Sequence, residues 1–340
     1  MNDLHETANE LVAGHRGILA ADESSGTIEK RFDTIGLEST EENRRAYRDL
    51  LFTTPHLEES VSGVILYDET LRQSSADGTP FAELLAGRGI IPGIKVDTGA
   101  KPLAGAPGET VTEGLDGLRE RLEEYRGLGA RFAKWRAVIA IGDGIPTAYC
   151  IEANAHALAR YAALCQEQGL VPIVEPEVLM DADNDIERCY RATRRTLHKV
   201  FDELYHQRVE LPGILLKPNM VLSGKGSATQ ASADEVAEWT IRCFRETVPA
   251  AVPGIVFLSG GQSDEQASRN LNSINSRGAQ PWVLSFSYGR ALQAPALKAW
   301  GGKAENVEAA QSFLALRARC NSAAVAGRYA AEMEELSRSS

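Results

Sequence analysis

Short apolar runs recur along the chain, and a longer stretch with apolar residues at helical spacing follows most of them. Eight of these runs have the length and the bordering turn residues of buried strands. They cover residues 17–24, 63–70, 93–99, 132–140, 171–177, 213–219, 254–261 and 282–290. The helical pattern between them is clearest at 115–129, 149–169 and 231–248.

Alternating strands and helices predict repeated βα units and a parallel sheet. Eight units predict an α/β fold of the closed (β/α)8 type, the TIM barrel, which typically needs about 250 residues. We expect the surplus of this 340-residue chain in an N-terminal helix at 1–16, an insertion at 73–83, and helices and a tail at about 300–340. An open doubly wound sheet would need a glycine fingerprint after its first strand, where this chain has ADESSG. We therefore predict one barrel domain spanning 1–340.

Composition excludes several classes of function. The chain has 36 Lys and Arg against 47 Asp and Glu, and its net charge of −11 argues against a general affinity for nucleic acid or anionic membranes. Its five cysteines are scattered without a C-x-x-C pair, as in a reduced cytosolic protein. The sequence shows no signal peptide and no apolar run of membrane-spanning length. We expect a cytoplasmic protein.

Charged and small residues gather where the predicted strands end. In a TIM barrel, the carboxyl ends of the strands meet at one face and carry the chemistry. The paired residues 134 and 136, and likewise 175 and 177, are two apart and so face the same side of their strands. The candidate residues at these ends are Asp22, Lys95, Lys134, Arg136, Glu175, Glu177, Lys217, Ser259, Gly260, Gly261, Gly289 and Arg290.

Lys217 directly follows the apolar run at 214–216 and precedes Pro218. Burial among other cations lowers the pKa of a lysine from about 10.4, so that a neutral amine can attack a carbonyl. Neighbouring carboxylates can carry the protons of imine formation. Alone, Lys217 could equally extend its ammonium into solvent, and the other charges could form structural ion pairs. The number of charged residues at strand ends that meet on one face of the barrel favours an active site.

The last two predicted strands point to a phosphorylated substrate. The turn SGGQSDEQA runs into a helix and offers backbone N–H groups at a positive helix end. The guanidinium of Arg290 can bind phosphate through two hydrogen bonds. In TIM barrels, the loops after strands seven and eight frequently bind phosphate. The alternative is an ordinary loop in which Ser263 caps the helix.

The sequence predicts no metal site and no cofactor. Residues 181–188 resemble the start of a calcium loop, but Ile186 replaces the required glycine and Ala192 the required glutamate. The six histidines form no H-x-x-x-H pair or cluster at the strand ends. The basic run at 188–199 is interpreted as the exposed face of a helix.

With these residues in place, the chain resembles class I fructose-bisphosphate aldolases, the Schiff-base type, from about residue 8 to residue 330. The motifs that carry the resemblance are GILAADES, TEENRRAYR, GVILYDETL, GIKVDTG, KPLAG, FAKWRAVI, VPIVEPE, LLKPNMV, FLSGGQS, FSYGRALQ and ALKAWGGK. The resemblance implies reversible cleavage of fructose 1,6-bisphosphate to dihydroxyacetone phosphate and glyceraldehyde 3-phosphate, in glycolysis and gluconeogenesis. It also implies metal independence and a homotetramer.

The resemblance implies a role for each candidate residue. Lys217 matches the lysine that attacks the C2 carbonyl, and Asp22 the acid that takes the C4 hydroxyl proton. Glu175 matches the general acid and base of imine formation, with Glu177 beside it. Lys134 and Arg136 match the cationic pair of the site, Lys134 as a catalytic residue and Arg136 as a substrate-binding residue. The matches to the C1-phosphate site are Ser259, Gly260, Gly261, Gly289 and Arg290, and those to the other phosphate region are Ser24, Thr27 and Lys95.

Two departures from the family pattern stand out. Animal members end in a tyrosine that assists proton transfer at C3, whereas this chain ends EEMEELSRSS and its last tyrosine is Tyr329. Thr27 stands where we align a serine. Other functions considered are a different ketose-phosphate lyase, such as a transaldolase-like enzyme, and a catalytically silent binding scaffold. The two phosphate regions argue against the first, and Lys217, Glu175 and Asp22 against the second. Preference between fructose 1,6-bisphosphate and fructose 1-phosphate stays open.

Overall fold

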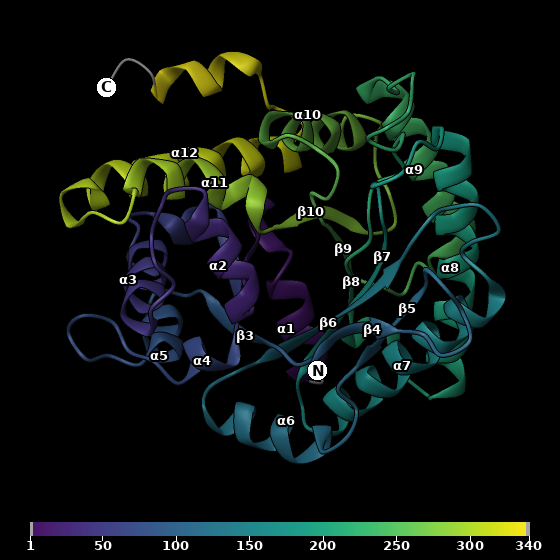
Figure 1. The fold of residues 1–340 in the computed structure, drawn as a ribbon, viewed down its shortest axis with the longest axis horizontal. Helices are drawn as coiled ribbons and strands as arrows, with labels where there is room; N and C mark the ends of the chain where they lie inside the picture. The colour runs from purple at the N-terminus through teal and green to yellow at the C-terminus, as the bar shows by residue number, and fades with distance from the viewer. Residues whose placement is uncertain (1–2, 338–340) are drawn as a thin grey trace.

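Eight parallel strands close into a barrel surrounded by helices, which confirms the predicted TIM barrel (Figure 1). The structure, a computed structural model, describes residues 3–337. The strands are β1 (Gly17–Ala21), β2 (Val61–Leu66), β3 (Ile91–Lys95), β6 (Phe132–Ile139), β7 (Val171–Val178), β8 (Leu215–Leu216), β9 (Gly254–Phe257) and β10 (Val283–Tyr288). Each predicted run overlaps one of them. Their order around the barrel is β1-β10-β9-β8-β7-β6-β3-β2.

The helices alternate with the strands along the chain. Those before β3 are α1 (Asp3–Glu10), α2 (Ser25–Asp33), α3 (Glu41–Phe52), α4 (Asp68–Leu71) and α5 (Phe81–Gly87). Those after β3 are α6 (Leu118–Gly127), α7 (Ala148–Glu167), α8 (Ile186–His206), α9 (Ala233–Thr247), α10 (Asp264–Asn275), α11 (Arg290–Trp300) and α12 (Val307–Val325). Single 3-10 turns are η1 (Ala13–His15), η2 (Leu57–Glu59), η3 (Leu211–Gly213) and η4 (Ala304–Asn306), and a longer segment is η5 (Ala331–Ser337).

The barrel interior is filled by apolar side chains, and α1 covers one end of it. Leu4 and Ala8 lie on one face of α1 and, with Leu11 and Val12, belong to the same buried cluster as the inward residues of the strands. Those strand residues are Ile18, Ala20, Ile65, Phe132, Val171, Ile173, Leu215 and Val256. This packing leaves the opposite end, where the strands finish, free for polar groups.

The N-terminal helix is shorter than predicted. It ends at Glu10, and η1 follows, because Gly14 takes a left-handed backbone conformation (φ 70°) that no α-helix continues through. At the other end of the chain, α12 packs alongside α11 (Figure 1). No helix among residues 3–337 combines the length and the apolar character needed to cross a lipid bilayer.

Helix α8 confirms the interpretation of the basic run at 188–199. Its arginines at 191, 194 and 195 are exposed, while Cys189, Thr193 and Leu197 are buried against the barrel. The segment before it contains a helix cap, since the side chain of Asp185 accepts a hydrogen bond from Arg188 N at 2.7 Å.

One element was not predicted, a hairpin of β4 (Gly99–Pro102) and β5 (Thr110–Glu113) after β3. It is fixed beside β6 by two threonine hydroxyls. Thr110 Oγ1 donates to Val138 O at 3.0 Å, and Thr112 Oγ1 donates to Arg136 O at 2.8 Å. The hairpin therefore supports the carboxyl end of β6, which carries predicted site residues.

Candidate active site

A cavity of about 330 Å³ lies at the carboxyl ends of the strands. It brings together thirteen of the fourteen predicted site residues: Asp22, Ser24, Thr27, Lys95, Lys134, Arg136, Glu175, Glu177, Lys217, Ser259, Gly260, Gly289 and Arg290. The fourteenth, Gly261, lines an adjoining cavity of about 420 Å³, and Arg136 and Arg290 line both. The geometry thus unites residues from strands across the whole chain.

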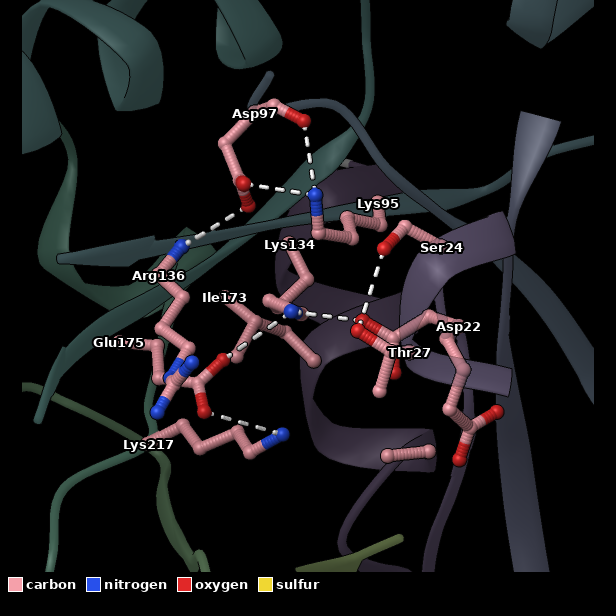
Figure 2. A network of polar contacts seen from close by, with 12 residues as sticks. Asp22, Ser24, Thr27, Lys95, Asp97, Lys134, Arg136, Ile173, Glu175 and Lys217 are labelled. Atoms are coloured by element: carbon pink, nitrogen blue, oxygen red, sulfur yellow. Dashed lines mark hydrogen bonds and ion pairs between the residues drawn. The ribbon is translucent and has the colours of Figure 1, made fainter. Parts of the chain in front are cut away.

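Lys217 enters the cavity from the end of β8. Its backbone N–H donates to Val174 O at 2.8 Å, which extends the contact between β7 and β8 by one bond. The side chain is only 4 % exposed, and its Nζ lies 3.3 Å from Glu175 Oε1 (Figure 2). The amine is therefore buried beside a carboxylate rather than extended into solvent.

Glu175 lies between two lysines. Its other oxygen, Oε2, is 3.4 Å from Lys134 Nζ, and that ammonium is 2.6 Å from Asp22 Oδ2 (Figure 2). Lys217, Glu175, Lys134 and Asp22 consequently form one buried chain of alternating charge across the barrel from β8 to β1.

The surroundings of Asp22 and Lys134 fix the charge that each of these two side chains carries. Burial disfavours a charged Asp22, but the ammonium groups of Lys134 and Lys217 outweigh it and hold the pKa of Asp22 well below its ordinary value. Burial likewise disfavours a charged Lys134, yet neighbouring carboxylates raise its pKa well above the ordinary value, those of Asp22, Glu175 and Asp97. Near neutral pH, Asp22 is a carboxylate and Lys134 a cation.

A second charged group joins β3, β6 and β7. Lys95 Nζ lies 2.6 Å from Asp97 Oδ1 and donates to Asp97 O at 2.8 Å, and Arg136 N donates to Asp97 Oδ2 at 3.2 Å (Figure 2). The guanidinium of Arg136 pairs with Glu177. Asp97, two residues after β3, was not among the predicted site residues, and it holds two of them in place, Lys95 and Arg136.

The loop after β9 approaches its neighbours closely. Gly261 has a left-handed backbone (φ 82°), and a Cβ there would lie 2.5 Å from Met180 Cβ, so a larger residue cannot take this conformation without displacing it. Helix α10 follows at once, capped by Ser263, whose Oγ accepts from Gln266 N at 3.1 Å. The Ser263 cap is therefore confirmed, and phosphate binding by this loop stays a prediction.

Arg290 begins α11, directly after β10. Its Nη1 lies 3.0 Å from Asp264 Oδ1, and its Nη2 donates to Gln262 O. The side chain is 47 % exposed and so retains access to the cavity. Two helix N-termini and one arginine therefore converge on the same corner, an arrangement suited to a phosphate group.

Comparison with known proteins fits this geometry. A model of the family described as fructose-bisphosphate aldolase class-I matches residues 3–340. The chain belongs to this aldolase family. A probable fructose-bisphosphate aldolase class 1 of Xanthomonas campestris pv. campestris is 62% identical over 330 residues, covering 97% of this chain and 99% of that protein. A cytosolic fructose-bisphosphate aldolase of Arabidopsis thaliana is 54% identical, with 95% and 92% covered.

A solved aldolase has the same fold. The fructose-bisphosphate aldolase of Plasmodium falciparum, in a complex with TRAP and a small-molecule inhibitor, superposes with a TM-score of 0.95 and 52% identity. The match covers 96% of this chain and 95% of that one.

This aldolase chain also has cavity residues that the sequence analysis missed. Arg31 lines the cavity with Ser24 and Thr27, whose hydroxyl oxygens are 3.1 Å apart. Glu23 pairs with Arg31 and, at 2.8 Å, with the buried Arg48. Burial opposes ionisation of Glu23, but the two arginines lower its pKa. The spacing of residues 24, 27 and 31 places them on one helix face, a signal that could have identified Arg31.

The described part of the aldolase, residues 3–337, contains no group of three or more His, Cys, Asp and Glu side chains placed to hold a metal ion. Its five cysteines are buried free thiols.

Proposed function

We propose that this aldolase cleaves fructose 1,6-bisphosphate through an imine on Lys217. The Lys217 ammonium passes a proton to the Glu175 carboxylate, and the neutral amine attacks C2 of the open-chain ketose. The carbinolamine then loses water as Glu175 returns that proton to the leaving hydroxyl. Glu175 suits this role because it lies 3.3 Å from Lys217 Nζ. The resulting iminium is the electron sink that the next step requires.

Carbon–carbon cleavage is assigned to Asp22. As a carboxylate it accepts the C4 hydroxyl proton while the C3–C4 bonding pair moves into the iminium, giving an enamine and glyceraldehyde 3-phosphate. Protonation of the enamine at C3 and addition of water to the iminium then release dihydroxyacetone phosphate and free Lys217. The lowered pKa of Asp22 supports this role, since the acceptor is ionised before the substrate arrives.

Substrate orientation is assigned to the two ends of the cavity. The loop at 259–261 and Arg290 would hold the C1 phosphate, and Ser24, Thr27 and Lys95 the C6 phosphate. Lys134 and Arg136 supply fixed positive charge between them, with Glu177 orienting Arg136. Both groups of proposed phosphate-binding residues line the same cavity, and each contains a cation. Two such groups support a bisphosphate substrate over a singly phosphorylated sugar.

The observation that carries the proposal is the position of Glu175 between two lysines of unequal environment. Lys134 is held as a cation by Asp22 at 2.6 Å and also contacts Glu175, whereas Lys217 has one contact, 3.3 Å to Glu175, among the ion pairs of the described residues. Lys217, which has fewer carboxylate partners, is therefore the amine assigned to attack the carbonyl.

Borohydride trapping tests the proposal. The protein is incubated with dihydroxyacetone phosphate and EDTA, reduced, and mapped by peptide mass. We expect an adduct on Lys217 with loss of cleavage activity. Lys217→Met abolishes the adduct, and Lys199→Met, which removes a lysine from the outer helix α8, does not. Activity without an adduct, abolished by EDTA, would indicate a metal enzyme, and neither adduct nor activity would indicate a binding scaffold.

Three further expectations go with the function. We propose that residues 1–340 form one domain and that the enzyme is a homotetramer, as the family resemblance implies. Two Arabidopsis thaliana relatives, 54% and 55% identical, are named cytosolic, which supports a cytoplasmic location. Light scattering of the purified protein tests the tetramer, and cell fractionation tests the location.

A further inference from the structure

The backbone contact between β7 and β8 stops just below the reacting groups. The two strands share the register pairs Ile173–Leu215 and Val174–Leu216. The hydrogen bond from Lys217 N to Val174 O is the last one of this ladder. In a regular parallel ladder, residue 176 would donate the next hydrogen bond to Lys217 O. That residue is Pro176, which has no N–H. The ladder therefore ends between Glu175 and Glu177.

The side chain of Asn219 joins the two strands beyond this break. Its Oδ1 accepts a hydrogen bond from Val178 N at 3.0 Å. Its Nδ2 donates to Thr193 Oγ1 of α8 at 3.1 Å and to Met220 O at 3.0 Å. The side-chain amide thus takes the place of the missing ladder bonds and also ties both strand ends to the helix behind them.

Asn219 is completely buried, and it is two residues from Lys217. Among the hydrogen bonds of residues 3–337, the bond from Val178 is the next one between the two segments after that of Lys217 N. On its other side, this segment is fixed through Pro218 O, which accepts from Leu258 N at 3.1 Å. An apolar side chain at 219 would leave the N–H of Val178 buried without an acceptor.

We propose that Asn219 is a positioning residue that sets the separation of the Lys217 amine and the Glu175 carboxylate. The inference rests on the proposed function, because it concerns proton transfer during imine formation at Lys217. With Nζ and Oε1 3.3 Å apart, the pair is at the outer limit of a hydrogen bond. A displacement of about 1 Å can slow such a step by roughly 100-fold.

The consequence is a specific kinetic signature. The proposed phosphate-binding residues follow β9 and β10, and loss of the Asn219 amide leaves their positions unchanged. Substrate affinity is therefore kept while imine formation slows. A residue that merely stabilised the fold would lower the melting temperature without separating these two quantities.

The test compares three variants in the full-length enzyme. Asn219→Ala removes the three hydrogen bonds of this side chain and the longer contact from Asn219 Nδ2 to Cys189 Sγ at 3.9 Å. Thr193→Val keeps the shape of the helix residue but removes one acceptor of Asn219 Nδ2. Asn275→Ala is the matched control, since Asn275 Nδ2 donates to Leu271 O at 3.1 Å and to Leu284 O at 3.2 Å, near the start of β10 and away from the cavity.

The rate of borohydride trapping with dihydroxyacetone phosphate is measured with KM for fructose 1,6-bisphosphate and the melting temperature. We expect Asn219→Ala to trap roughly 10- to 100-fold more slowly with KM within about twofold, and Thr193→Val about threefold more slowly. Asn275→Ala loses thermal stability but traps at the wild-type rate.

Wild-type trapping rates in Asn219→Ala and Thr193→Val would overturn the inference and leave the proposed function intact. If Asn219→Ala does not fold, the rate of the nearly isosteric Thr193→Val decides. If the wild-type enzyme itself forms no adduct on Lys217, the proposed function fails, and the positioning role fails with it.

Discussion

Two lysines share one carboxylate in this site, and their other neighbours give them different chemistry. Lys134 contacts both Asp22 and Glu175, whereas the contact of Lys217 is with Glu175 at 3.3 Å. A buried ammonium with two carboxylates is stabilised as a cation, and its removal would leave negative charges unpaired. Lys134 therefore serves as the fixed charge that keeps Asp22 ionised.

The lowered pKa of Asp22 predicts how acid affects stability. The unfolded chain binds a proton at this residue near its ordinary pKa of 3.8, whereas the folded chain resists protonation to lower pH. Ionised Asp22 therefore stabilises the fold fully above that pH, and this contribution is lost as pH falls toward the folded-state pKa.

We expect the free energy of unfolding to fall more steeply in the wild type than in Asp22→Asn between about pH 5 and pH 3. Urea denaturation at a series of pH values measures the difference. Parallel curves for the two proteins would mean that Asp22 does not carry this linkage.

Thr27 offers a test of the distal phosphate assignment. Thr27→Val keeps the size of the side chain but removes the hydroxyl that lies 3.1 Å from Ser24 Oγ. A hydrogen bond to a charged group contributes about 1.5 kcal/mol, so KM for fructose 1,6-bisphosphate should rise roughly tenfold. Fructose 1-phosphate lacks the C6 phosphate and is the control substrate. An equal rise with both sugars would place Thr27 outside the distal site.

At the scale of elements, two helix N-termini lie at the corner of the cavity that we propose binds the C1 phosphate. Helices α9 and α10 both begin with a capping box, Ser232 with Glu235 and Ser263 with Gln266. The two caps are chemically alike, but only α10 directly follows the glycine loop that lines the cavities.

Removing each cap in turn distinguishes an effect on stability from an effect on catalysis. Ser232→Ala and Ser263→Ala should each lower the free energy of unfolding by about 1 kcal/mol. Only Ser263→Ala should also reduce kcat/KM, by roughly threefold to tenfold, because the loop at 259–261 loses its fixed orientation. Chemical denaturation and steady-state kinetics measure the two effects. Equal kinetics in both variants would contradict a binding role for this helix end.

The strands could be predicted because a buried parallel strand is a continuous apolar run, a signal carried entirely by neighbouring residues. The hairpin of β4 and β5 could not, since its sequence between Gly99 and Glu113 is turn-rich and the threonine bonds that fix it go to β6, far from it in sequence. Likewise, Asp22 is visible at a strand end, but the pairing of Glu23 with Arg48 depends on how α3 packs against the barrel. Tertiary contacts of this kind leave no local pattern.

At the scale of the molecule, the first and last strands close the barrel. β1 pairs with β10 through the register pairs Ile18–Ser287 and Leu19–Tyr288. The same closure brings Asp22, at the end of β1, to the cavity that Arg290 lines. Neither half of the chain contains the complete set of charged groups.

We therefore expect loss of the barrel and loss of activity to coincide. Urea unfolding of the wild type should show one transition, with the same midpoint by far-ultraviolet circular dichroism and by residual cleavage activity. A first transition that removes activity while most helical signal persists would indicate that the proposed single domain unfolds in parts.

The closure of β1 on β10 also has a consequence for the enzyme while it is being synthesised. The groups assigned to bond making and breaking all lie before residue 218, and the loops assigned to the C1 phosphate come after residue 258. A nascent chain thus contains Lys217 long before it contains the loops that are assigned to bind the substrate phosphate. Until the ribosome has delivered β9 and β10, β8 lacks its neighbour β9 and the barrel that buries Lys217 stays open to other aldehydes.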